Sequence, residues 1–416
     1  METIKLILRS KELRNGFLII IGLVTIFRLA AHIPVPGIDS GSLESLINGN
    51  QFLGLLNLFS GGTLESFSIV ALGLAPYITA SVVFQLLGMI FPSVEELQKD
   101  EQGRQKMNAY TRLATIPLAI FQGFSLVALV NQQAGLAIVG LNLFFALISL
   151  TAGTVFLMWL GELISERKLG NGISLLIFAG IIAGVPSFVA NYAATYTRAD
   201  LIEVLVFLGL TVVTIGAVVA INEAQRNLPV QYARGGGGAS GKVMSNLPLR
   251  VNLGGMIPIL FALSLMSLPP LMAQFFVAAR TEAVKEIAIF ISELFANQLF
   301  YGIAYFLLVG IFTFFYASVV FRPEQISENL QKQGGFIPGI RPGKQTALYL
   351  TWVVNRILLA GAFFLASVAV LPIVVQGFTG NTNLVVGGAS VIIIVSVVVD
   401  LIKQTQAQLS MRAYDV

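Results

Sequence analysis

Residues that could perform chemistry are few in this sequence and far apart. Cysteine is absent and His32 is the one histidine, which excludes cysteine-ligated zinc or iron–sulfur centres and metal sites built from several histidines. Neither a HExxH nor a GxSxG pattern occurs. Glu162, Glu223 and Asp400 stand at the ends of long apolar stretches and not in their middles. We therefore expect neither an enzyme nor a bound metal or cofactor.

One glycine-rich segment comes close to a phosphate-binding loop. Residues 236–242 have the glycine and lysine spacing of such a loop, but Val243 stands where a serine or threonine is required. The segment also follows an apolar helix and not a strand. A flexible glycine linker is the better interpretation.

The composition is that of a protein that crosses a membrane many times. Of its 416 residues, 56% are hydrophobic and 11% are charged, against about 25% charged in soluble domains. A helix of about 20 apolar residues spans the hydrocarbon core. Seven stretches lack charged residues, and two of them are long enough for two spans each: 66–94, 113–161, 169–197, 204–222, 251–279, 294–321 and 357–399. With a first span at 15–38, which only Arg28 interrupts, they predict ten transmembrane helices.

Basic residues indicate which helix ends face the cytoplasm. If both termini are cytoplasmic, all but four of the 25 lysines and arginines lie inside. The exceptions are Arg28, Arg198, Arg280 and Lys285. The long inner connections 222–250 and 322–348 suggest a docking surface for a cytosolic partner, although charge that only sets the topology would look the same. The outer connection 278–298 suggests an amphipathic surface turn or helix.

A short apolar segment, 51–64, stands between the first two full spans. Apolar pieces of this length are often re-entrant, and the pair Gly61-Gly62 near its end provides a hinge. We expect the segment to re-enter the membrane from the outer side, where it could block a pore.

Four motifs lie along the chain, at 57–62 with 68–81, 159–166 with 170–174, 247–252 with 255–258, and 336–343. In residues and in order they resemble the SecY family, the main channel subunits of bacterial protein translocation. The ten-helix layout is similar from end to end. The tip between Tyr232 and Leu247 departs from the family, because it holds only Arg234 and Lys242 as basic residues and a glycine run between them. Partner binding through that tip is therefore in doubt.

The resemblance implies an all-α polytopic membrane protein that conducts unfolded secretory polypeptides. Two inverted five-helix halves, 1–195 and 196–416, would surround a pore, with a re-entrant plug helix near 55–67. Signal and transmembrane segments would leave sideways between the second/third and seventh/eighth helices. The plug residues would be Asn57, Phe59, Ser60, Gly61 and Gly62.

The resemblance also implies partners and a location. SecE and SecG would be partner subunits, SecA ATPase or the ribosome would drive transport, and signal peptides and precursor proteins would be the cargo. The chain would lie in the lipid bilayer of the bacterial plasma membrane with both termini in the cytoplasm, and no sequence-specific nucleic acid is expected. Arg341, flanked by residues that fix turns, would contact SecA and the ribosome with Arg226 and Lys344. A solvated loop charge is the alternative.

The family's pore constriction falls on six aliphatic residues of this chain: Leu74, Ile78, Ile173, Ile177, Leu260 and Ile393. Leu74 and Ile78 are four residues apart, and so are Ile173 and Ile177, so the two members of each pair would share a helix face. A ring of large aliphatic side chains excludes ions by dewetting and yields to any passing side chain. Ordinary core packing is the alternative.

Thr79, Gln122 and Asn252 match a polar cluster at the family's lateral gate. Polar side chains pair inside a membrane for about 0.6 kcal/mol, so the cluster could hold a gate shut until a signal helix separates it. For Asn252 a helix N-cap is an equal alternative. A secondary solute transporter with inverted repeats is the alternative function, because its hydropathy would look similar.

Overall fold

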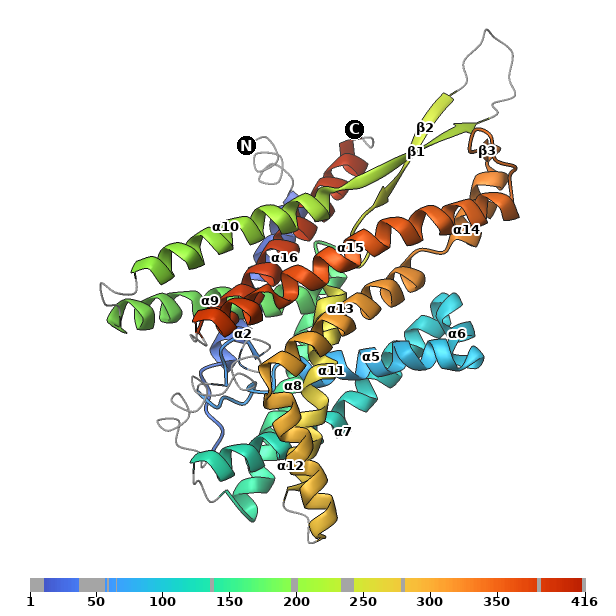
Figure 1. Cartoon of the computed structure of the whole chain (residues 1–416). Helices are drawn as coiled ribbons and strands as arrows, with labels where there is room; N and C mark the ends of the chain where they lie inside the picture. Colours follow the sequence, from blue (N-terminus) through green and yellow to red (C-terminus); the bar gives the residue numbers. More distant parts are fainter. Residues whose placement is uncertain are drawn as a thin grey trace.

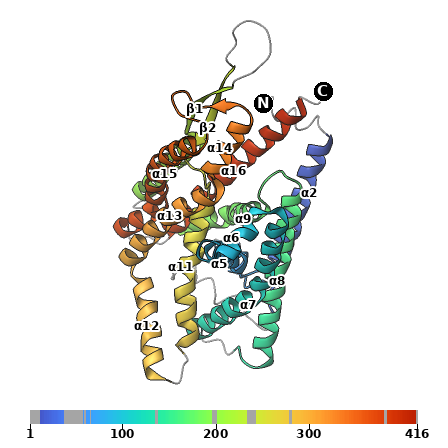
Figure 2. The same cartoon turned by 90° about the vertical axis from the view of Figure 1, so that its right-hand side faces the viewer.

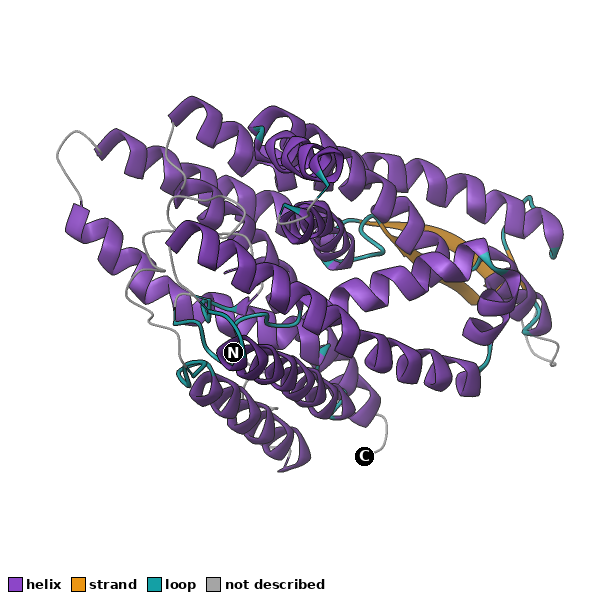
Figure 3. Ribbon diagram, turned by 90° about the horizontal axis from the view of Figure 1, so that it is seen from below, coloured by secondary structure: helices purple, strands orange, loops and turns teal. Residues whose placement is uncertain are grey.

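The structure, a computed structural model, is mostly helical and describes residues 11–36, 57, 60–64, 66–134, 138–195, 201–232, 243–277, 281–379 and 383–413. Its helices are α2 (Lys11–Ala30), α5 (Ala75–Ile90), α6 (Pro92–Lys99), α7 (Glu101–Ala134), α8 (Leu141–Glu166), α9 (Gly172–Thr195), α10 (Leu201–Glu223), α11 (Ile257–Phe276), α12 (Glu282–Ala296), α13 (Gln298–Val320), α14 (Pro323–Lys332), α15 (Lys344–Thr379) and α16 (Asn383–Ala413). Figure 3 shows that helices make up the bulk of the molecule.

Several of these helices can cross a membrane. Within the described ranges, seven helices are long and apolar enough to do so, and α5, α9 and α10 contribute the shorter apolar stretches Ala75–Gly88, Gly172–Pro186 and Leu208–Glu223. Proline at the first turn of α5 and of α11 is compatible with a helix start, because the N–H groups there have no partner within the helix. A mostly helical, polytopic membrane protein is thus confirmed.

Both ends of the described chain lie on one side of the bundle. In Figure 2 the start of α2, the end of α16 and the strands β1 (Gln225–Tyr232) and β2 (Val243–Arg250) lie at the top, whereas α12 lies at the opposite end (Figure 1). The predicted amphipathic segment forms α12, with Glu282 and Lys285 exposed and Ala288 buried. This arrangement suits a chain that returns to the side on which it began.

The prediction of an all-α protein is wrong in the connection 222–250. Strands β1 and β2 form an antiparallel pair with Leu228 opposite Leu247, and β3 (Gly335–Phe336) pairs with the other edge of β1. The resulting sheet has the order β2-β1-β3. The sheet therefore joins the two long connections, which the sequence presented as separate loops, into one structure.

The physical reason for the sheet is a hydrophobic face. Leu228, Val230 and Leu249 are buried and pack in one cluster with Leu330 of α14 and Leu350 of α15. Alternating residues of β1 point to opposite faces, so the intervening Pro229 remains exposed. Burial of this face against two helices stabilises strands that the glycine run alone would not predict.

Backbone hydrogen bonds join the residues that follow α2 to the residues that precede α5. The Val35 N–H donates to the Phe67 carbonyl, and the Ile69 N–H donates to the Ile33 carbonyl. Leu64 and Phe67 are each 1% exposed, in a cluster with side chains of α7 and α8. These contacts anchor the end of the predicted plug segment and the residues that follow it.

Candidate functional site

Five of the six predicted pore residues are almost fully buried, at 2–4% exposure, and all six contact one hydrophobic cluster. They are Leu74 beside the start of α5, Ile78 on α5, Ile173 and Ile177 on α9, Leu260 on α11 and Ile393 on α16, with Ile173 the partly buried member. Segments far apart in the sequence thus supply side chains to the same apolar centre. This burial suits both a closed ring and ordinary packing, so the ring itself stays a prediction.

Asn57, Ser60, Gly61 and Gly62 of the predicted plug are described, whereas Phe59 lies outside the described residues. Asn57 organises the turn: its carbonyl accepts from the Gly62 N–H at 2.8 Å and from the Ser60 hydroxyl at 3.0 Å. Gly61 has φ +75°, a backbone conformation that favours glycine. The expected hinge position therefore coincides with a tight, left-handed turn.

Gly61 packs directly on α9. A Cβ built on Gly61 would lie 2.7 Å from the Cα of Gly180, and one built on Gly180 would lie 2.4 Å from the Cα of Gly61. Only two glycines permit so close a backbone approach. Gly180 is three residues from Ile177, about 4.5 Å along the helix axis, so the predicted plug and the predicted ring are neighbours.

Arg28 also holds the turn, a role that sequence reasoning missed. Its Nη1 donates to the Gly61 carbonyl at 2.9 Å, and its guanidinium lies 5.8 Å from the centre of the Phe27 ring. The position of Arg28 near the outer end of an apolar run is also typical of an arginine that extends to the membrane interface. A lone arginine near the end of an apolar run gives no signal that its partner is a backbone carbonyl 33 residues away.

Two of the three predicted gate residues lie together. The Thr79 hydroxyl is 2.6 Å from the Ser264 hydroxyl of α11, and Gln122 Nε2 of α7 is 3.4 Å from Thr79 Oγ1. Ser264 was not predicted. Close by in the sequence, Phe121 and Phe124 pack against Phe275 of α11, with ring centroids 5.5 and 5.1 Å apart. Polar and aromatic contacts thus join α11 to α5 and α7.

Among the described residues Asn252 has hydrogen-bond partners other than Thr79 and Gln122, so its place in one cluster with them stays a prediction. Its Nδ2 donates to Asn222 Oδ1 at 2.7 Å and to the Gly255 carbonyl at 3.1 Å, and its Oδ1 is buried without a partner among the described residues. It is not the N-cap of α11, because Met256 occupies that position. Asn252 instead ties the segment before α11 to the end of α10.

A lysine of α16 also binds the end of α10. Lys403 Nζ donates to the Asn222 carbonyl at 2.6 Å and lies 3.0 Å from Glu223 Oε1. A cation at the end of α10 is favourable, because the last carbonyls of a helix carry partial negative charge. The two hydrogen bonds and the ion pair connect α10, α16 and the segment before α11.

The three residues predicted to contact cytosolic partners are exposed, at the end of the molecule that carries the sheet. Arg226 lies on β1, Lys344 begins α15, and Arg341 lies between Gly339 and Gly343, both with positive φ. The Thr346 hydroxyl donates to the Arg341 carbonyl at 2.9 Å. The turn is therefore fixed while the Arg341 side chain remains accessible.

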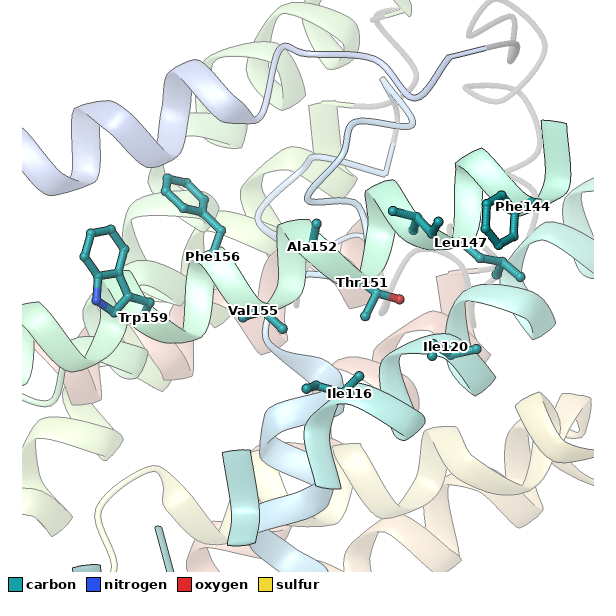
Figure 4. Close-up of a pocket in the computed structure, with 10 residues that line it drawn as sticks. Ile116, Ile120, Phe144, Leu147, Thr151, Ala152, Val155, Phe156 and Trp159 are labelled. Atoms are coloured by element: carbon teal, nitrogen blue, oxygen red, sulfur yellow. The ribbon is translucent and has the colours of Figure 1, made fainter. Parts of the chain in front are cut away.

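One groove lies away from all these residues. It has a volume of about 670 Å³ and is lined by residues of α7 and α8, as Figure 4 shows. Its walls are almost entirely apolar, with Ile116 and Ile120 on one side and Trp159 at one end (Figure 4). None of the predicted site residues lines it.

An apolar centre built from distant segments, a glycine turn packed beside it and a polar contact between helices are compatible with a gated membrane channel. The family model described as SecY matches residues 68–402. The protein translocase subunit SecY of Streptomyces coelicolor is 39% identical over 429 residues, which cover 98% of this chain and 97% of that protein.

Solved structures agree with the fold. "The structure of a protein conducting channel" matches with a TM-score of 0.65 and 17% identity, over 92% of this chain and 90% of that chain. A structure on the plug domain of SecY and the closed state of its translocation channel matches with a TM-score of 0.63 and 18% identity, over the same shares.

The chain belongs to the SecY family. It is a protein translocase subunit that forms a protein-conducting channel, and it is not an enzyme. The channel function expected from the sequence is therefore confirmed, and the solute-transporter alternative finds no support in these relatives.

Proposed function

We propose that ten transmembrane helices form two inverted halves, 1–195 and 196–416, around the translocation pore. The first half comprises α2, α5, α7, α8 and α9, and the second α10, α11, α13, α15 and α16. Seven long apolar helices and three shorter apolar ones support this count. Both termini and the sheet lie in the cytoplasm of a bacterium, in agreement with the positions of the basic residues.

The pore is closed by an aliphatic ring and a plug. The observation that carries this proposal is that six aliphatic side chains, from α5 and the residue before it, α9, α11 and α16, belong to or pack against one apolar cluster. Gly61 lies beside Gly180, one helical turn from Ile177 and towards the outer end of α9. A plug in that position blocks the outer side of the ring, and the ring excludes ions because its side chains cannot replace their hydration.

The lateral gate opens between α11 and the pair α5 and α7. The contact of Thr79 with Ser264 and that of Phe275 with Phe121 and Phe124 support this position. An apolar signal helix that inserts there breaks a few weak contacts between the helices. Its own burial in lipid compensates for their loss. A signal or transmembrane segment can then leave sideways.

Partners act on the cytoplasmic side. SecA or the ribosome supplies the driving force through Arg341, Arg226 and Lys344, whose exposed charges suit acidic or phosphate-bearing surfaces. SecE and SecG complete the complex. The rigid turn that presents Arg341 supports a specific contact, since little side-chain and loop freedom is lost on binding.

Site-specific crosslinking tests this function. A photoreactive residue at Ile78 in the reconstituted channel should crosslink to a stalled, signal-bearing precursor. The same probe at Leu359, 65% exposed on the outer face of α15, is the control and should not crosslink to the mature part of the chain. Equal crosslinking at both positions, or none at Ile78 during active transport, would contradict a path through the ring.

A further inference from the structure

One face of α15 carries aromatic, basic and aliphatic side chains in succession. Tyr349 stacks on Trp352 with ring centroids 6.2 Å apart, and the guanidinium carbon of Arg356 lies 3.9 Å from the centre of the Trp352 ring. Leu359 and Phe363 continue this face and are 65% and 66% exposed. Spacings of three and four residues keep all five on one side of the helix. We call this face the α15 stripe.

Arg356 stands where the α15 stripe enters the hydrocarbon. After it the sequence runs without a charged residue from 357 to 399. Leu358 belongs to one hydrophobic cluster with Ala317, which lies three residues before the end of α13 at Val320, so this part of α15 lies near the end of a neighbouring apolar helix. Arginine and tryptophan at the end of a span lie at the depth of the lipid headgroups.

The guanidinium of Arg356 is held but not neutralised. The ion pairs of the described residues join Arg112 to Glu162 and Lys403 to Glu223, and neither includes Arg356. Stacking on Trp352 occupies one face of the guanidinium, and its N–H edge stays free for paired hydrogen bonds. A fixed cation at headgroup depth that forms no ion pair with a described residue is complementary to a phosphate.

We propose that the α15 stripe is a binding site for an anionic phospholipid. Arg356 holds the headgroup phosphate, Trp352 lies beside the headgroup, and the acyl chains run along Leu359 and Phe363. A zwitterionic lipid binds less well, because its cationic group brings a second positive charge towards Arg356. No described carboxylate forms an ion pair with Arg356 that would offset this repulsion. Figure 2 shows α15 at the edge of the bundle, where lipid can reach it.

The tryptophan content of the chain allows a direct test, because the sequence has two tryptophans. Trp159→Phe leaves Trp352 as the single fluorescent reporter in the full-length channel. Vesicles would contain either phosphatidylglycerol or phosphatidylcholine with brominated acyl chains, at the same mole fraction in an unbrominated background. Brominated phosphatidylglycerol should be enriched about fivefold at Trp352, as expected for one basic residue near the membrane surface.

Matched variants distinguish specific binding of the anionic lipid at Arg356 from general contact with the membrane. Arg356→Gln should equalise quenching by the two lipids, whereas Arg356→Lys should retain part of the preference because it keeps the charge but loses the paired hydrogen bonds. The Trp352→Phe channel, which reports from Trp159, is the control. Glu162, one turn from Trp159, is already paired with Arg112, so the two lipids should quench Trp159 equally.

Two results would overturn the proposal. One is equal quenching of Trp352 by both lipids in the protein that retains Arg356. The other is the absence of quenching by either lipid while Trp159 is quenched normally, because the α15 stripe would then be covered by protein, either a partner helix or a second copy of the chain.

Discussion

The hydroxyl of Thr79 on α5 lies 2.6 Å from the hydroxyl of Ser264 on α11, across 185 positions of sequence. Both residues are buried, at 2% and 3% exposure. Gln122 extends the contact to α7. Three helices are thus joined by short polar side chains at the position we propose for the lateral gate.

Loss of this hydrogen bond should make the gate easier to open. In Ser264→Ala the contact worth about 0.6 kcal/mol is absent, which shifts the balance between closed and open channel about threefold. Export of precursors with graded signal hydrophobicity should therefore extend to weaker signals. Ser367→Ala on α15 is the control, because among the described residues the Ser367 hydroxyl bonds its own helix alone, at the Phe363 carbonyl. An unchanged threshold in Ser264→Ala would remove this bond from the gate.

The Asn222–Asn252 pair should couple the end of α10 to the start of α11. Asn222→Ala or Asn252→Ala leaves the other buried amide without its partner, at a cost of about 1–3 kcal/mol. Each variant should lower the thermal unfolding midpoint of the membrane-reconstituted protein. The double variant should be no less stable than the worse single variant, because the bond between Asn222 and Asn252 is already lost in each single variant. Strictly additive shifts would show that the two amides act independently.

Replacement of Asn252 by leucine should also change signal selection. The leucine cannot bond Asn222, so the segment before α11 loses its polar tie to α10 and α16. We expect a shifted hydrophobicity threshold in the same graded export assay. If Asn252→Leu gives the wild-type threshold, Asn252 stabilises the fold without influencing the gate.

The contact of Gly61 with Gly180 should seal the resting channel. In Gly180→Ala the added Cβ would lie 2.4 Å from the Cα of Gly61, so the turn must move away from α9. Gly184→Ala on the same helix is the matched control, because its Cβ meets no atom within 4 Å. Planar-bilayer recordings without precursor should show ion leakage for the first variant only. Equal, low conductance of both would contradict a seal at this contact.

Much of the helical fold could be predicted from the sequence, and the sheet could not. Charge-free runs of about 20 residues identify spans because lipid offers no partner to an open backbone. In the connection 222–250, the glycine run suggested a linker and concealed the strands on either side of it. The alternation of Leu228 and Val230 was a usable signal for β1, but its partner β3 lies about a hundred residues further on.

The candidate site shows the same limit. The glycine pair at Gly61 could be recognised because a hinge has a local signature. Ser264 and Arg28 could not, because each is defined by a partner that is distant in sequence. Asn252 was assigned by resemblance to a cluster, whereas hydrogen bonding to Asn222 places it near the end of α10.

Arg341 should matter for motor-driven transport. Arg341→Glu reverses an exposed charge in a fixed turn, so paired bonds to an acidic partner become repulsive. SecA-driven translocation into vesicles should fall about tenfold, ~1.4 kcal/mol. Lys332→Glu, equally exposed on α14, should have little effect. A normal rate for Arg341→Glu would assign Arg341 to the solvated loop charges.

The conductance of resting channels tests the account most directly. Ile78 and Ile177 are 4% and 2% exposed in the apolar cluster, and serine at both positions would offer ions a polar, narrower side chain. Reconstituted into planar bilayers without precursor, the Ile78→Ser/Ile177→Ser channel should pass small ions where the wild-type channel does not. Wild-type conductance in this variant would show that these aliphatic side chains do not form the barrier.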